Sequence, residues 1–443
     1  MDRIDSKVIE LMKNNISLEG LRKYLSENKK TLVKPLEKAK KVEQEKKTLV
    51  KPLEKAKKVD KVDSKKAPPA NLFTRHPDIN AVVPEKNRGF YKTKVGVTCA
   101  FFHDLYTNGH RFNTLLWYDM LTQSGYDVYF VTRKSTHVPK TNDFKVRRFE
   151  DNDMSQIKDL DVIFMCGTLD QSMIRYCRSV KKRYIYTIMG STYHNDVRAV
   201  LNPEFRNPTA QFEVDEIWMS PHFEFCREYY KVKYRTDNIF VGPYFWRDDL
   251  MLQGKINNTV NKMFLRLRVA IVEPNIEQAK NCMIPIAICE KAKDHIDHCY
   301  VFNTFHLKSN TALQNYIGNL DLYKTKKISV EKRYRLGVIL SRFANCVVSC
   351  VRDCELNYVH LECFYLGIPI VHNSKMLKEY GYYYPDYDVS KGAEQLKNIL
   401  LHHNREEYIK RHKPILQKYS VYNSMYHAWI QDRLEKKSVT DCK

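Results

Sequence analysis

The chain has 443 residues, a formal net charge of +22, 43% hydrophobic residues and 12% aromatic residues. This length exceeds one ordinary domain, and the apolar content is sufficient for substantial cores. No run approaches the ~18 apolar residues of a membrane-spanning helix, and the N-terminus lacks the apolar core of a secretory signal. We therefore expect a soluble, cytoplasmic protein without a transmembrane segment, whose cysteines are reduced thiols.

A basic arm occupies residues 1–70, which hold 20 Lys and Arg against 11 Asp and Glu, or +9 of the +22. Within it the segment KKTLVKPLEKAKKV occurs twice, at 29–42 and 46–59. Two copies are fewer than the ~3 that a solenoid needs, so we expect a helical spacer. Apolar spacing at 4–15 and 17–25 predicts an amphipathic hairpin that could dock a partner. No zinc-finger, RNP-type or zipper pattern accompanies the charge, so we expect no specific nucleic-acid partner.

A Pro-rich linker at 71–93 precedes a region in which strand-like and helix-like segments alternate, as in doubly wound α/β folds. The predicted strands are 95–102, 127–133, 161–167, 184–190, 214–220, 267–274, 299–305, 346–351 and 369–374; the predicted helices are 111–125, 221–234, 284–295 and 331–343. Two βαβ halves follow, 94–248 and 249–415, with a C-terminal helix in 416–443. A ligand of such a fold binds at the carboxyl ends of its strands.

The most informative stretch runs from Glu355 to Val371. The loop after strand 346–351 leads into a helix containing Glu362, which Gly367 and Pro369 end before the next strand. Carboxylates accept hydrogen bonds from several hydroxyls, and a helix N-terminus offers free amides to phosphate. The stretch resembles the donor-site signature of retaining GT-B glycosyltransferases. The resemblance implies two Rossmann-like domains facing a cleft, the first for the acceptor and the second for the nucleotide sugar, with the C-terminal helix crossing back to the first.

In that signature one acid grips the sugar hydroxyls and the second grips the ribose, with seven residues between them. Here only six residues separate Glu355 from Glu362. The position that would leave seven residues before Glu362 is occupied by Cys354. Either Glu355 reaches the sugar from a shifted loop, or the first carboxylate is absent. Region 94–430 more closely resembles an uncharacterised, GT-B-related family of bacteria and giant DNA viruses. The matching residues are Leu356-Asn357-Tyr358, Glu362, Gly367, Pro369 and Val371-His372-Asn373-Ser374. Packing of a helix on a strand explains Gly367 and Pro369 but not the acid and Asn-Tyr cluster.

Asn275 and Lys280 lie where the strand at 267–274 turns into its helix. Retaining members of the resembled group carry Arg and, five residues later, Lys at this turn to clamp the diphosphate. Lys280 retains the positive charge of that Lys. Asn275 stands at the Arg position, so a neutral amide donor replaces a guanidinium that could bind phosphate through two hydrogen bonds. The alternative is that Lys280 is an ordinary exposed helix residue.

Two turns of the first half are candidates for the cleft. Asn108 and Gly109 suit the positive dihedrals of a tight loop, and Gly109 would let the backbone approach a ligand. The Asn108-Gly109 turn also resembles the Asn-Gly turn of the related family, and Asn113 matches that family as well. Gly190 and His194 follow another strand end and would face the acceptor. His194 is either a general base or a surface histidine with its hydrogen bonds satisfied.

We expect no metal site. Asp386-Tyr387-Asp388 matches the Asp-x-Asp pattern of another glycosyltransferase fold, but it stands late in a Tyr- and Pro-rich loop. Four cysteines with His360 have no zinc-knuckle spacing and fit buried thiols beside a strand. These cysteines are Cys346, Cys350, Cys354 and Cys363. The only small molecule that we expect is the nucleotide-diphosphate sugar itself, as substrate and not as a cofactor.

The resulting hypothesis is a glycosyltransferase that moves a sugar to an acceptor hydroxyl, with retention and without an obligatory metal. Lys280 and Glu355 would be catalytic; Glu362 would hold the ribose, and Asn357 and Tyr358 the sugar. The acceptor, whether glycan, protein or lipid, stays open. Two alternatives remain: a GT-B-shaped binding or scaffold protein without catalysis, which Cys354 and Asn275 both permit, and a nucleic-acid-associated protein working through its basic arm.

Overall fold

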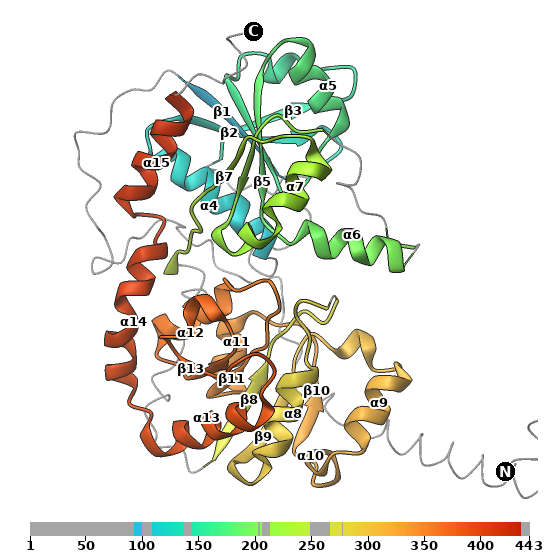
Figure 1. Cartoon of the computed structure of the whole chain (residues 1–443), viewed down its shortest axis with the longest axis vertical. Helices are drawn as coiled ribbons and strands as arrows, with labels where there is room; N and C mark the ends of the chain where they lie inside the picture. Colours follow the sequence, from blue (N-terminus) through green and yellow to red (C-terminus); the bar gives the residue numbers. More distant parts are fainter. Residues whose placement is uncertain are drawn as a thin grey trace, which may run out of the picture. The chain divides into compact units, whose positions relative to one another are not determined.

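The computed structural model describes residues 93–99, 109–136, 144–202, 204–205, 213–248, 266–276 and 278–435. All of these residues belong to one compact unit. Within it lie two parallel β-sheets, each flanked by helices (Figure 1). The predicted basic arm, its repeats and almost all of the predicted linker lie outside the described residues.

The first sheet has seven strands in the order β3-β2-β1-β4-β5-β6-β7, and every neighbouring pair is parallel. Its strands are β1 (Lys94–Thr98), β2 (Asp127–Arg133), β3 (Val146–Phe149), β4 (Val162–Cys166), β5 (Arg183–Ile188), β6 (Ile217–Met219) and β7 (Ile239–Val241). Its helices include α4 (Gly109–Gln123), α5 (Gln171–Ser179), α6 (Thr192–Leu201) and α7 (Arg227–Tyr234), with a 3-10 helix η5 (Pro221–Cys226). The strand order reverses between β1 and β4, as expected of a doubly wound sheet.

The second sheet has six parallel strands in the order β10-β9-β8-β11-β12-β13. They are β8 (Leu267–Ile271), β9 (Ile296–Val301), β10 (Ile328–Val330), β11 (Cys346–Val348), β12 (Ile370–His372) and β13 (Tyr382–Tyr383). The helices are α8 (Met283–Lys291), α9 (Thr311–Gly318), α10 (Asp321–Lys324), α11 (Leu336–Arg342), α12 (Tyr358–Leu366) and α13 (Val389–His402). Here the strand order reverses between β8 and β11. In doubly wound folds, a ligand-binding crevice forms at such a reversal, outside the carboxyl ends of the two strands.

Central strands form because their residues are apolar on both faces. β4 reads VIFMC and is buried along its whole length, as parallel strands covered on both sides are. On one face of the first sheet, Trp117 of α4 packs against Phe164 and Trp218 at ring distances of 5.5 and 5.8 Å. Such large rings supply much of the buried apolar area of a core.

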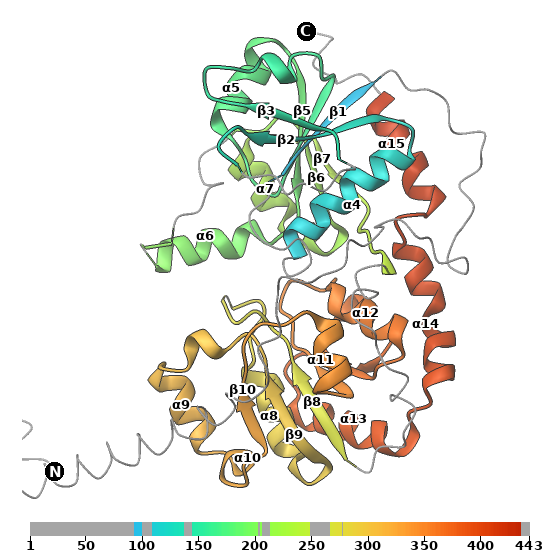
Figure 2. The same ribbon diagram turned by 180° about the vertical axis from the view of Figure 1, so that it is seen from behind.

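The last helices connect the two halves of the unit. α14 (Arg405–Tyr419) packs on α12, and α15 (Ser424–Glu435) packs on α4 (Figure 2). Trp429 of α15 lies 4.7 Å from the Trp218 ring, and the Arg183 guanidinium donates to the carbonyls of Arg433 and Leu434. α15 thus completes the core of the first half although it follows the second half in sequence.

The prediction of an α/β fold with two doubly wound sheets is confirmed. The sequence prediction did not include β3, β7, β10 and β13, which are the edge strands of the two sheets. β3 reads VRRF and β13 has two residues, so neither carries the apolar run of a central strand. Among the described residues, no helix has the length and apolarity required to span a membrane.

Candidate active site

The loops after β8 and β11 run side by side at the carboxyl edge of the second sheet. The two strands are paired, and beyond them Lys280 and Val351 form an antiparallel bridge. The Arg352 amide also donates to the Ala279 carbonyl at 2.8 Å. This pairing places Lys280 beside the loop that leads into α12, where ligands bind in doubly wound folds.

A buried polar network lies beneath these loops. Glu273 is 1% exposed, and its carboxylate accepts hydrogen bonds from the Ser349 hydroxyl (2.6 Å) and the Cys350 amide (3.3 Å). The Ser349 oxygen in turn lies 3.1 Å from His360 Nε2. Burial raises the pKa of Glu273, while the Ser349 hydrogen bond and the charge of Lys280 act in the opposite direction. The network therefore ties β8, β11 and α12 together, although burial outweighs these contacts and leaves the pKa of Glu273 raised.

Asn275 lies in the β8 loop with a positive φ of 56°, a conformation that Asn tolerates better than most residues. Its side-chain nitrogen donates to the carbonyls of Glu273 (2.7 Å) and Phe302 (3.4 Å), and its oxygen accepts from the Cys282 amide (2.7 Å). The side-chain amide of Asn275 therefore makes its hydrogen bonds to backbone groups around this turn. The structure places Asn275 as a residue that shapes the loop carrying Lys280.

α12 begins at the pair that the sequence singled out. The Asn357 side chain accepts a hydrogen bond from the Val359 amide and so caps the helix. The Tyr358 ring lies between Phe112 of α4, at 5.0 Å, and Tyr244, which follows β7, at 5.3 Å. Tyr358 therefore joins the start of α12 to the first half of the unit.

Glu362 lies one turn into α12 and is 7% exposed. Burial raises the pKa of its carboxyl to about 7. Within the described part of the chain, no protein group donates a hydrogen bond to it. An unpartnered buried acid is costly, and perturbed acids of this kind concentrate at functional sites.

Glu355 precedes α12 and contacts the loop after β12. Its carboxylate accepts from the Lys375 amide at 2.5 Å, and its carbonyl accepts from the Ser374 hydroxyl at 2.8 Å. Burial raises the pKa of Glu355, whereas these contacts act against the rise. At the other end of α12, Gly367 has a φ of +68°, and a Cβ there would lie 2.6 Å from the Arg405 side chain. Only glycine fits this helix end without strain.

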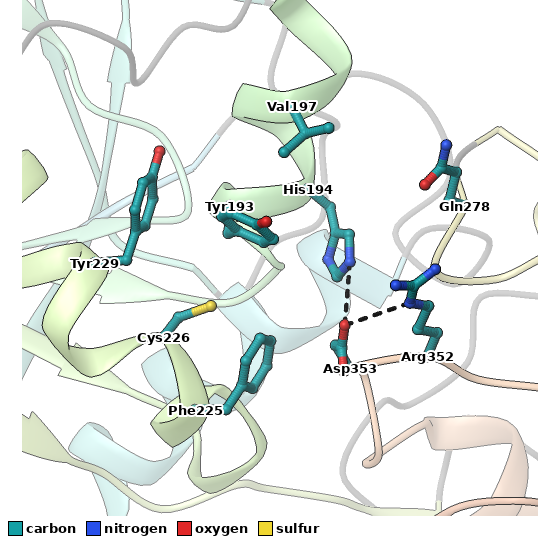
Figure 3. Close-up of a pocket in the computed structure, with 9 residues that line it drawn as sticks. All are labelled: Tyr193, His194, Val197, Phe225, Cys226, Tyr229, Gln278, Arg352 and Asp353. Carbon is teal, nitrogen blue, oxygen red and sulfur yellow. Dashed lines mark ion pairs between the residues drawn. The ribbon is translucent and has the colours of Figure 1, made fainter. Parts of the chain in front are cut away.

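A pocket of about 390 Å³ lies between α6, η5 and α7 of the first half and the β8 and β11 loops of the second (Figure 3). Its lining residues are Tyr193, His194, Val197, Phe225, Cys226, Tyr229, Gln278, Arg352 and Asp353. His194 Nδ1 lies 2.6 Å from the Ser191 hydroxyl, which also caps α6. His194 Nε2 lies 3.4 Å from the Asp353 carboxylate, which also lies 3.7 Å from Arg352.

His222 of η5 connects this pocket region to Lys280. The ring is buried, and burial followed by the positive charge of Lys280 lowers the pKa of His222 to about 3. The charge of Lys280 is therefore felt by side chains of both halves. A cation in that position suits a ligand whose negative charge lies between the two sheet edges.

The predicted loop after β1 is only partly described, and Asn108 lies outside the described residues. Gly109 begins α4 and is not among the positive-φ glycines, so the predicted positive dihedral is wrong for this residue. A Cβ at Gly109 would lie 3.6 Å from the Tyr358 ring. Asn113 is buried on α4, and a Cβ at Gly190 would meet open space. Helix formation, rather than a tight turn, explains the conformation of Gly109.

The structure therefore gathers Lys280, Glu355, Asn357, Tyr358 and Glu362 around the start of α12 and brings His194 to the facing edge. Sequence reasoning gave no role to Glu273, Ser349, His222, Arg352 or Asp353. Strand-end position was the available signal for Ser349 and Arg352, because both stand at the end of a predicted strand.

The residues of the Asp-x-Asp pattern have local partners. Asp388 caps α13 by accepting from the Lys391 amide, and Asp386 pairs with the Lys375 ammonium at 3.0 Å. The eleven cysteines of the described chain are free thiols, and all except Cys354 are buried.

The paired sheets, the crossing C-terminal helix and the strand-end loops define the GT-B class of fold. The chain belongs to the family described as protein of unknown function DUF2827, whose model matches residues 95–434. A comparison with curated proteins found no match.

Solved structures of glycosyltransferases share the fold at low sequence identity. The glycosyltransferase from Rickettsia africae ESF-5 has a TM-score of 0.54 and 10% identity, covering 78% of this chain and 100% of its own. Anabaena Alr3699/HepE, solved with UDP and glucose, gives the same values. An alpha-glucosyltransferase solved with UDP and a 13-mer DNA containing an HMU base has a TM-score of 0.52 and 11% identity, covering 78% of this chain and 99% of its own.

Proposed function

We propose that this protein transfers a sugar from a nucleotide-diphosphate sugar to an acceptor hydroxyl. The observation that carries the proposal is Glu362, a buried carboxyl to which no group of the described residues donates a hydrogen bond, on the helix that follows the loop beside Lys280. Polyhydroxyl ligands supply the donors that such a carboxyl lacks. Two proteins of the same fold, Anabaena Alr3699/HepE and the alpha-glucosyltransferase, were solved with UDP, which supports a nucleotide as the ligand.

In the proposed donor complex the diphosphate lies between Lys280 and the amides at the start of α12. Helix N-termini and ammonium groups both favour phosphate there. Glu362 holds the ribose hydroxyls, and Glu355 holds the sugar. Asn357 orders the helix start by accepting from the Val359 amide, and Tyr358 forms the wall of the sugar subsite toward the first half. Asn275 maintains the turn that positions Lys280 and is not itself a phosphate ligand.

The reaction breaks the bond between the anomeric carbon and the β-phosphate oxygen, and the electron pair leaves on the diphosphate. A bond forms between the anomeric carbon and the acceptor oxygen on the same face, so configuration is retained. The acceptor proton passes to the departing diphosphate oxygen. Lys280 and the helix amides stabilise the charge that develops there, a contribution that does not require a metal.

A direct test is the release of nucleoside diphosphate from a panel of UDP-, GDP-, dTDP- and ADP-sugars by the full chain. We expect release with one nucleotide class, and its loss in Glu362→Gln. The matched control is Glu394→Gln, because Glu394 is exposed on α13 and pairs only with Lys391 among the described residues. Equal release by both variants would remove Glu362 from the donor site.

A second function is favoured by one observation. The Asn275 side chain makes its hydrogen bonds to backbone groups around its own turn. The position therefore lacks the Arg with which the resembled group binds phosphate through two hydrogen bonds. A protein that binds a nucleotide sugar without transferring it would have this property. Tight binding of a nucleotide with no diphosphate release from any sugar in the panel would support this binding function over catalysis.

A further inference from the structure

The pocket in Figure 3 has two chemically different walls. One wall comes from α6, η5 and α7 and presents the rings of Tyr193, Phe225 and Tyr229. The other comes from the loops after β8 and β11 and presents Gln278 and Arg352, together with the Asp353 carboxylate. A ligand that fills this pocket needs an apolar face on one side and hydrogen-bonding groups on the other.

The aromatic wall is exposed. Phe225 is 53% exposed, Tyr193 38% and Tyr229 36%, although large rings are usually buried or paired at partner sites. Solvent and ligand therefore reach the faces of these rings. Isolated exposed rings are unremarkable, but three rings lining one pocket form a patch that calls for a ligand.

The rings of the two tyrosines are held in place before any ligand binds. The Tyr229 hydroxyl donates to the Asp196 carboxylate at 2.6 Å, and Asp196 also pairs with the Lys233 ammonium at 2.6 Å. Tyr193 packs edge-on against Tyr229 with ring centres 5.2 Å apart. Fixed rings lower the ordering entropy that a ligand must overcome on binding.

The polar wall holds hydrogen-bond acceptors and donors. Asp353 accepts, Arg352 donates, and the Gln278 amide can do either, as can the His194 ring, which reaches Asp353 from α6. This mixture matches hydroxyl groups, each of which both donates and accepts. Phosphate groups only accept, and the Asp353 carboxylate would repel them, so a nucleic-acid backbone fits this wall less well.

We propose that this pocket is the acceptor site and that its ligand is a saccharide. A pyranose ring has C–H groups on its faces, which pack on aromatic rings, and hydroxyls on its edge. The volume of about 390 Å³ lies at the small end of the range for small-molecule sites, which suits one or two sugar rings. The proposal rests on the transferase function proposed above and extends it by naming the class of acceptor.

The location of the pocket fits that role. Gln278 is two residues from Lys280, and Asp353 is two residues from Glu355, so the polar wall continues the two loops that carry the proposed donor site. A hydroxyl held against this wall lies next to the donor sugar. Its oxygen bonds to the anomeric carbon as the diphosphate departs, and its proton leaves with the diphosphate, as in the reaction above.

The test uses the full chain on an array of immobilised mono- and oligosaccharides, with UDP present, and compares substitutions at Phe225. Phe225→Ala removes the ring, Phe225→Leu keeps an apolar side chain without a ring, and Phe225→Tyr keeps the ring. We expect saccharide binding to fall about tenfold or more in the first two and to persist in the third. Val232→Ala is the control, because Val232 is 81% exposed on α7 and does not line the pocket.

A UDP-induced shift in melting temperature, measured on the same variants, separates the two proposals. If Phe225→Ala and Phe225→Leu keep the UDP-induced shift but lose saccharide binding, the result supports both the donor site and the acceptor site. A normal UDP shift without saccharide binding by the wild type, or with equal binding by all variants, overturns the acceptor proposal alone. Binding of a single-stranded oligonucleotide that is lost in Phe225→Ala, in place of saccharide binding, also overturns it. Absence of any UDP shift counts against the donor site, whatever the array shows.

Discussion

The two sheet edges that carry the candidate site are built differently. The edge of the second sheet holds buried ionisable groups, with Glu273 in a hydrogen-bond network and Glu362 without a hydrogen-bond donor among the described residues. The edge of the first sheet presents exposed rings around His194. Burying charge costs stability, whereas exposing rings forgoes stability that burial would give. The buried carboxyls of the second sheet would be stabilised by a ligand that donates hydrogen bonds. The exposed rings of the first sheet would be stabilised by a ligand that covers them with an apolar face.

The same contrast extends to the remainder of the second half, where His360, His372 and His412 are fully buried. Burial lowers the pKa of each ring. In the described part of the first half, a comparably strong lowering is found for His222, whose pKa is about 3. The second half should therefore respond more strongly to pH than the first.

Acidification should produce the largest effect. Ser374 donates to His372 Nδ1 and Gly381 donates to His412 Nε2, so protonation of either ring breaks a backbone hydrogen bond. Burial lowers the pKa of each to about 4. The unfolded chain takes up these protons below about pH 6.5, so the stability that these two rings contribute is complete above that pH and falls toward pH 4. The loss is about 3 kcal/mol for each ring, measured as the urea midpoint between pH 7.5 and 4.5.

Substitution isolates this pH effect. His412→Gln retains one donor and one acceptor but does not titrate, so its urea midpoint should fall less steeply with acid. His402 is exposed, and His402→Gln should keep the wild-type slope. Equal changes of the midpoint with pH in the wild type and in His412→Gln would contradict the account of the buried rings.

Replacing Lys280 should produce the next largest effect, on catalysis. Lys280→Met removes the cation placed beside α12, and we expect kcat/KM for sugar transfer to fall by about 10² to 10³. Lys291→Met, at the exposed end of α8, is the control and should leave the rate unchanged. A Lys280→Met protein with normal kinetics would show that the diphosphate does not rely on this residue.

Glu362→Gln should separate stability from binding. Because burial raises the pKa of Glu362 to about 7, the wild type loses stability as the pH rises from about 4.5 to 7 and then reaches a plateau. The variant removes this loss, which amounts to about 3 kcal/mol at pH 8. Thermal unfolding should therefore show a more stable variant that no longer binds nucleotide. A less stable variant that still binds would mean that Glu362 has a structural role.

Asn275→Ala should produce the smallest effect, and mainly on stability. It removes three hydrogen bonds from the β8 loop and places alanine at a φ of 56°, which should cost about 1–2 kcal/mol. Urea unfolding measures this cost. If Asn275 instead binds phosphate, stability would be unchanged while the Kd for UDP rises.

The sequence predicted the architecture better than the orientation of side chains. Central strands such as β4 carry long apolar runs, and Gly367 marks the end of α12, because these features depend on local residues. The inward rotation of the Asn275 amide depends on a carbonyl of Phe302, contributed by a distant strand.

Contacts between the halves were also beyond sequence reasoning. The approach of Asp353 to His194 joins residues more than 150 positions apart. Nothing in the local pattern around either residue encodes that distance. The start of α4 at Gly109 shows the same limit, since an Asn-Gly pair is compatible with both a turn and a helix start.

The most direct test of the central claim is isothermal titration of UDP into the wild type, Lys280→Met, Glu362→Gln and Glu394→Gln. The account predicts one binding site in the wild type and in Glu394→Gln, with affinity weakened at least about tenfold in the other two variants. Equal affinity in all four proteins, or no binding of UDP, GDP, dTDP or ADP to any of them, would contradict a nucleotide-sugar site at the start of α12.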